Sequence, residues 1–181
     1  DDNVEKIETD EEILKKKEND LLFTEENLDN AQNPLIGLYD PEENNLTIDM
    51  WKYSDGDQVK SILKKIFSLN LSKDADNILN IALMTNSYNP KKKINFQEFT
   101  NLKLQYLQNK NDLDLIKKFL KKNEKIKNGD EIIKIYLDNH ILNGNIKEGC
   151  KLFEEIKINI SETYLEKFKI YCYLNDNRVE E

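Results

Sequence analysis

The sequence predicts an all-α protein, and three observations carry this prediction. The 181 residues are 38% hydrophobic and 34% charged but include only five Gly and three Pro, a composition that favours helices over a turn-rich β fold. Apolar residues recur at helical spacing from Ser54 onward. Three later segments share a helix–turn–helix pattern. We therefore expect antiparallel helix pairs stacked as a tetratricopeptide-like α-solenoid.

Residues 1–33 form an acidic arm with twelve Asp or Glu and four Lys. This arm has few large apolar residues and much like charge, so we expect it to be largely disordered. Leu21, Leu22 and Phe23 could form a docking peptide for another protein. The alternative interpretation is a solvated tether.

Residues 34–53 are an irregular lead-in segment, because Pro and Gly interrupt any helix there. Its many apolar side chains indicate that it packs on the helical body. Tyr39, Met50 and Trp51 are the candidate residues of this segment. They could anchor it to the core or act as a hot spot that binds a partner.

Residues 54–181 are predicted to form the helical-repeat domain. Ser54 or Asp55 is placed to cap the first helix, and Ser72 the second. The residues at core spacing in these two helices are Val59, Ile62, Leu63, Ile66, Phe67, Ala75, Ile78, Leu79, Ala82 and Leu83.

The repeats are marked by Asn-rich turns at Asn109, Asn143 and Asn175, which lie 34 and then 32 positions apart. A period near 34 with a helix hairpin in each unit is typical of tetratricopeptide-like arrays. Each hairpin has an apolar stripe that it can bury only against the next hairpin, so stability is expected to come from neighbours.

The segment from His140 to Cys150 is interpreted as a turn between two helices. Gly144 stands between two Asn and tolerates the left-handed conformation that ends a helix. His140 falls in the last turn of the first helix, and Cys150 on the inner stripe of the second.

Residues typical of catalysis, metal binding or cofactor binding are not recognised in the sequence. It has one His, no Cys-x-x-Cys motif and no Gly-rich phosphate loop. A nucleophilic pair of Cys150 and His140 is formally possible, but Cys150 is predicted to be buried and inert. We therefore predict no catalytic, cofactor-binding or metal-ligating residues and no cofactor.

The charge distribution argues against nucleic acid as a partner. The arm carries the whole net charge of −8, and the remainder is neutral, so a phosphate backbone would gain little. No apolar run is long enough to suggest direct membrane insertion. The chain starts at Asp1, and we expect it to be the N-terminal part of a longer protein.

Cys150 and Cys172 are predicted to lie on neighbouring antiparallel helices at similar heights. A disulfide between them is geometrically plausible. Two unlinked core thiols are the alternative.

The stretch from Ile36 to Ile66 resembles the corresponding segment of a group of uncharacterised alphaproteobacterial envelope or secreted helical-repeat proteins, in which a Gly-Leu-Asp turn precedes an Asp-Met-Trp motif and a Val- and Leu-rich helix. The similarity covers about residues 35–178. The matching residues are Gly37, Leu38, Asp40, Asp49, Met50, Trp51, Val59, Ile62 and Leu63.

The resemblance implies secretion to the periplasm or cell envelope, an all-helical repeat body and no known reaction. Cys150 and Cys172 also fit its pattern, which favours the disulfide. If the protein is instead cytoplasmic, the thiols stay reduced.

These observations predict a non-catalytic scaffold module that binds a protein partner, as a peptide or a helix in a groove. The alternative is the helical scaffold domain of a larger cell-envelope enzyme whose catalytic domain lies outside this chain.

Overall fold

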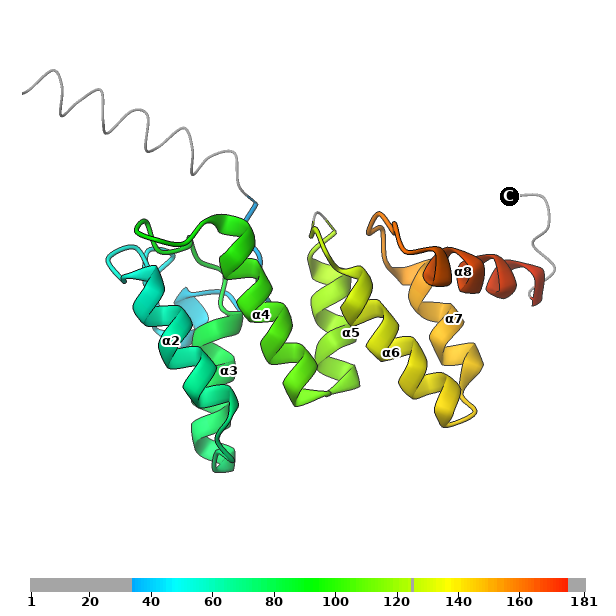
Figure 1. Ribbon diagram of the computed structural model, residues 1–181, viewed down its shortest axis with the longest axis horizontal. Helices are drawn as coiled ribbons and strands as arrows, with labels where there is room; N and C mark the ends of the chain where they lie inside the picture. The colour runs from blue at the N-terminus through cyan, green and yellow to red at the C-terminus, as the bar shows by residue number, and fades with distance from the viewer. Residues whose placement is uncertain (1–33, 125, 176–181) are drawn as a thin grey trace, which may run out of the picture. The chain divides into compact units, whose positions relative to one another are not determined.

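The computed structural model describes residues 34–124 and 126–175 (Figure 1). The chain divides into two units, Asp1–Pro34 and Leu35–Glu181, and all the helices below belong to the second. The predictions for the acidic arm, including Leu21, Leu22 and Phe23, lie outside the described residues.

Regular structure in these described ranges is entirely helical, which confirms the all-α prediction. No strand occurs among them, only the isolated bridge pairs Tyr39–Thr85 and Asp55–Lys92. The helices are η1 (Glu42–Asn44, a 3-10 turn), α2 (Gly56–Phe67), α3 (Lys73–Met84), α4 (Phe96–Lys110), α5 (Leu113–Lys122), α6 (Asp130–Leu142), α7 (Ile146–Glu155) and α8 (Thr163–Asn175).

Side-chain caps explain where several helices begin. The Asp55 carboxylate accepts hydrogen bonds from two backbone N–H groups of the first turn of α2, at 3.0 and 3.2 Å. The Ser72 hydroxyl caps α3 in the same way. The Ser72 cap was predicted, and Asp55 is one of the two residues predicted to cap α2, the other being Ser54. Asn95 and Glu98 form a reciprocal capping box at the start of α4.

The two turns that end α4 and α6 use residues that tolerate positive φ. Asn111 ends α4 with a φ of 48°, and Gly144 follows α6 with a φ of 71°. The predicted turn at Asn109 was wrong by two positions, because α4 continues through Lys110 and the Asn111 N–H still bonds the Leu107 carbonyl at 3.0 Å.

Helix α6 lies at the centre of the packing. It contacts α4, α5, α7 and α8, and its residues Ile132, Ile133 and Leu137 are fully buried. The stripe predicted for α5 is buried with it and consists of Leu115, Ile116, Phe119 and Leu120. The apolar faces of these helices are therefore covered by their neighbours.

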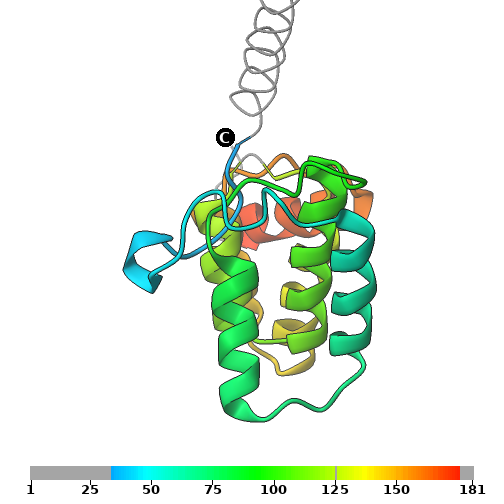
Figure 2. The same ribbon diagram turned by 90° about the vertical axis from the view of Figure 1, so that its left-hand side faces the viewer.

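The helix contacts follow an alternating order. Helix α2 contacts α4, α4 contacts α6, and α6 contacts α8, while α7 packs against both α6 and α8. Figures 1 and 2 show the axes of α2, α3 and α4 running in similar directions, with the loops at their ends. Across the described ranges, no helix is both long and apolar enough to cross a bilayer.

Two residues expected at the core are instead exposed. Ile62 on α2 is 54% exposed and Ile78 on α3 is 68% exposed. Helix α2 packs against α4 and buries Val59 and Leu63, so its packing covers a narrower stripe than the apolar pattern suggests. Helix α3 likewise buries only its C-terminal end.

This difference gives a test within one helix. Leu83 on α3 is fully buried, so Leu83→Ala should lower the free energy of unfolding by about 2–5 kcal/mol. Ile78→Ala on the same helix should change it by less than about 0.5 kcal/mol. Urea denaturation followed by circular dichroism would measure both. Equal losses for the two variants would contradict the burial described here.

Candidate functional site

The inner part of the lead-in segment, Ile36 to Tyr39, lies along the end of α3. The N–H groups of Leu38 and Tyr39 both donate to the Met84 carbonyl, at 2.6 and 3.2 Å. The Asn86 N–H returns a bond to the Tyr39 carbonyl at 3.0 Å. The backbones approach closely at Gly37, where a Cβ would lie 2.7 Å from the Met84 carbonyl oxygen. The segment is thus bound like an extended peptide.

The C-terminal end of α5 holds the same segment from the other side. The buried Asn123 amide accepts the Gly37 N–H at 3.0 Å and donates to the Gly37 carbonyl at 3.1 Å. It also donates to the Phe119 carbonyl at 2.8 Å. The Lys122 ammonium donates to the Leu38 carbonyl at 2.5 Å. These bonds satisfy backbone groups that a buried loop would otherwise leave unpaired.

Lys103 of α4 supplies the third support and is almost completely buried, with 1% of its surface exposed. Its Nζ donates to the carbonyls of Ile36 and Thr85 at 2.5 and 3.2 Å. It also lies 5.2 Å from the centre of the Phe99 ring. Burial lowers the pKa of Lys103 to about 7.

The surroundings of Lys103 suit a structural role. A neutral amine still has two N–H groups, one for each of the two carbonyls. When the amine is charged, the C-terminal end of α3 at Thr85 and the Phe99 ring both favour the cation. In either state Lys103 joins the lead-in segment to α3 and α4.

The structure places the three predicted lead-in residues as follows. The Tyr39 hydroxyl accepts a hydrogen bond from the Asn80 side chain at 2.8 Å. Trp51 packs edge-on against Phe99, with ring centres 5.8 Å apart, and its buried indole N–H has no hydrogen-bond partner among the described residues. Met50 is half-buried. Tyr39 and Trp51 therefore contact the core; that they bind a partner stays a prediction.

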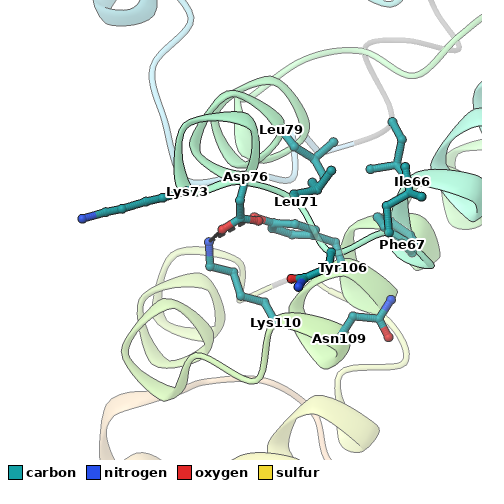
Figure 3. A pocket seen from close by; sticks show the side chains of 11 residues that line it. Ile66, Phe67, Leu71, Lys73, Asp76, Leu79, Tyr106, Asn109 and Lys110 are labelled. Atoms are coloured by element: carbon teal, nitrogen blue, oxygen red, sulfur yellow. Dashed lines mark hydrogen bonds and ion pairs between the residues drawn. The ribbon is translucent and has the colours of Figure 1, made fainter.

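A pocket opens between the α2–α3 connection and the end of α4 (Figure 3). Its volume is about 450 Å³, within the range of sites that receive a side chain or small ligand. We call it the Tyr106 pocket, and it is lined by Ile66, Phe67, Leu69, Asn70, Leu71, Lys73, Asp76, Leu79, Tyr106, Asn109 and Lys110.

One wall of the Tyr106 pocket carries three polar side chains that bind one another. Lys110 forms an ion pair with Asp76 at 2.6 Å and donates to the Tyr106 hydroxyl at 3.2 Å. The Tyr106 hydroxyl donates to Asp76 at 3.2 Å. Burial raises the pKa of Tyr106 to about 12, so its phenol stays protonated near neutral pH and cannot serve as a base.

The region around His140 contains the second candidate site. The His140 ring lies 4.5 Å from that of Tyr136, and its buried Nε2 has no hydrogen-bond partner within the described ranges. Cys150 and Cys172 form a disulfide that joins α7 to α8, with Cα atoms 5.3 Å apart. A bonded Cys150 offers no thiolate to pair with His140. The described residues hold no group of three or more His, Cys, Asp or Glu that could bind a metal ion.

Lys103 and the polar group of the Tyr106 pocket were not predicted from the sequence. A signal for Lys103 existed, because it stands between Phe99 and Leu107 at helical spacing, on the apolar stripe of α4. Tyr106 and Lys110 are also one turn apart, whereas Asp76 lies 30 positions earlier. The approach of Asp76 depends on how α3 and α4 pack, which spacing alone does not give.

No family model, curated protein or solved structure matches this chain. The resemblance to alphaproteobacterial envelope proteins therefore stays a prediction.

The lowered pKa of Lys103 predicts how stability depends on pH. Between about pH 7 and the ordinary lysine pKa of 10.5, the unfolded chain keeps a proton at this residue that the folded protein has lost. The contribution of Lys103 to the free energy of unfolding should therefore rise with pH, by at most about 1.4 kcal/mol per pH unit.

The measurement compares urea unfolding of the wild type and Lys103→Met at several pH values from neutral to mildly alkaline. The comparison cancels groups that titrate in both proteins. The wild type should gain stability relative to Lys103→Met as the pH rises. A constant difference across this window would contradict a lowered pKa.

Proposed function

We propose that this chain is a non-catalytic protein-binding module, built of helix pairs stacked as a tetratricopeptide-like α-solenoid. The alternating contacts among α2, α4, α6 and α8 support the stacked arrangement. So does the regular turn spacing, since Asn111 and Asn143 follow α4 and α6 and are 32 positions apart. Modules of this kind bind partners on the faces that stacking leaves uncovered.

The observation that carries the binding function is the Tyr106 pocket. Besides Tyr106, five lining residues have large apolar side chains around a volume of about 450 Å³, namely Ile66, Phe67, Leu69, Leu71 and Leu79. Such a pocket suits an apolar anchor side chain of a protein partner. Leu69 is 62% exposed and would be covered by that partner.

The polar wall of the same pocket supports binding over catalysis. Asp76, Tyr106 and Lys110 already bind one another. Burial raises the pKa of Tyr106 to about 12, which keeps its phenol protonated near neutral pH and disfavours a role as a general base. These groups would orient a partner through hydrogen bonds. We therefore propose that the Tyr106 pocket binds a partner and does not act as a catalytic site.

We propose that the protein resides in an oxidising compartment, such as the periplasm or cell envelope, and the Cys150–Cys172 disulfide supports this proposal. Disulfides persist mainly in such compartments and are rare in the cytosol. A cytoplasmic location would require these two residues to be reduced.

Site-specific photocrosslinking in the cells that make the protein tests the binding function. The photoreactive residue p-benzoylphenylalanine replaces Asn70, an exposed residue on the rim of the pocket. The control carries it at Asn143, an exposed residue of the α6–α7 turn. We expect one discrete protein adduct from position 70 and none of the same mass from position 143.

Two charge-introducing variants make this test specific to the pocket. Leu69→Glu should reduce the adduct at least about fivefold, because a buried unpaired carboxylate opposes docking of an apolar side chain. Leu142→Glu on α6 is the matched control, since Leu142 is 84% exposed and lies outside the pocket. The proposal fails if no adduct forms, or if Leu69→Glu leaves the adduct unchanged.

A further inference from the structure

Besides the Tyr106 pocket, the structure has a groove along α5 with a volume of about 540 Å³. Its floor is apolar and its rim is basic. We call it the Lys118 groove, and it is lined by Leu38, Tyr39, Leu115, Lys118, Lys121 and Lys122.

The floor is rigid because the lead-in segment and α5 hold each other. Leu38 is fixed through its backbone by Met84 and by the Lys122 ammonium, and Leu115 is buried in α5. The groove is thus formed before any ligand arrives, which lowers the entropic cost of binding.

The rim carries positive charge that its surroundings only partly neutralise. Glu155 pairs with Lys117 at 3.0 Å and with Lys121 at 3.3 Å, so it serves two ammonium groups. Lys118 is exposed and has neither a hydrogen-bond nor an ion-pair partner among the described residues. Within α5 itself four Lys stand against the single acid Asp114.

We propose that the Lys118 groove binds a segment of a protein partner in which Asp or Glu flanks an apolar side chain. The apolar side chain would lie on Leu38 and Leu115, and the carboxylates would pair with Lys118 and Lys121. The lysines select a partner segment of negative charge, and the apolar floor selects the size of its apolar side chain.

The apolar floor is what favours an acidic peptide over a polyanion. A nucleic acid or a lipid headgroup surface would satisfy the lysines but would leave the floor of Leu38, Tyr39 and Leu115 without an apolar partner. The chain also lacks the excess of basic residues outside this groove that such polyanions need, because the net charge is −8.

Fluorescence anisotropy with a labelled peptide, Glu-Asp-Leu-Glu-Phe-Glu-Leu-Asp-Glu, tests the proposal on the full chain. A second peptide with Gln and Asn in place of the acids tests the charge, and a third with Ser in place of Leu and Phe tests the floor. The first peptide should bind at least tenfold more tightly than either control peptide. Its affinity should fall as salt is added.

The protein variants locate the binding. Lys118→Glu combined with Lys121→Glu should weaken the first peptide at least tenfold. The matched control is Lys64→Glu combined with Lys65→Glu, two exposed residues in the last turn of α2, which should change the affinity less than twofold. Circular dichroism melting checks that both doubly substituted proteins fold. Leu69→Glu should leave this affinity unchanged, which separates the groove from the Tyr106 pocket.

Several results would overturn the proposal. They are absence of peptide binding, an equal loss for the two doubly substituted proteins, or tighter binding of oligothymidylate or of phosphatidylserine vesicles than of the acidic peptide. Self-association in sedimentation that Lys118→Glu with Lys121→Glu abolishes would assign the groove to a second copy of the chain instead.

Discussion

The structure depends on one constraint: the apolar stripes of its helices can leave water only by covering one another. Helix α6 satisfies this constraint on most of its circumference, because it contacts α4, α5, α7 and α8 and fully buries Ile132, Ile133 and Leu137. Helices α2 and α8 lie at the two ends of the contact order α2–α4–α6–α8 and contact fewer helices than α6 does. Their uncovered faces, for example Ile62 on α2 and Ile170 on α8, remain in solvent.

The lead-in segment is held by a different kind of interaction. Its backbone runs past the ends of α3 and α5, where it meets the carbonyl of Met84 and the side chains of Lys103 and Asn123. Burying these polar groups is tolerable only because each finds a partner. The segment in turn provides Leu38 and Tyr39 as the floor of the Lys118 groove, so the same bonds that stabilise the fold also shape a surface.

The helices were predictable because their signals are local. Apolar spacing, the caps at Asp55 and Ser72, and the Gly144 turn each depend on a few adjacent residues. The exposure of individual side chains was not predictable. Ile78 has the same spacing as a core residue and differs only in having no neighbour to cover it. The buried polar contacts were missed for a similar reason: Lys103 meets Ile36 across 67 positions of sequence. Helices and turns could therefore be predicted from the sequence, but the pockets between them could not.

Native-state hydrogen exchange read by mass spectrometry tests the claim of mutual helix burial most directly. If burial between neighbours stabilises this fold, the backbone amides of α6 should exchange most slowly, because they open only when the whole stack opens. Protection should then decrease towards α2 on one side and α8 on the other. Exchange in α6 that is as fast as in α2 or α8 would contradict the account, since it would mean that each helix is stable independently of its neighbours.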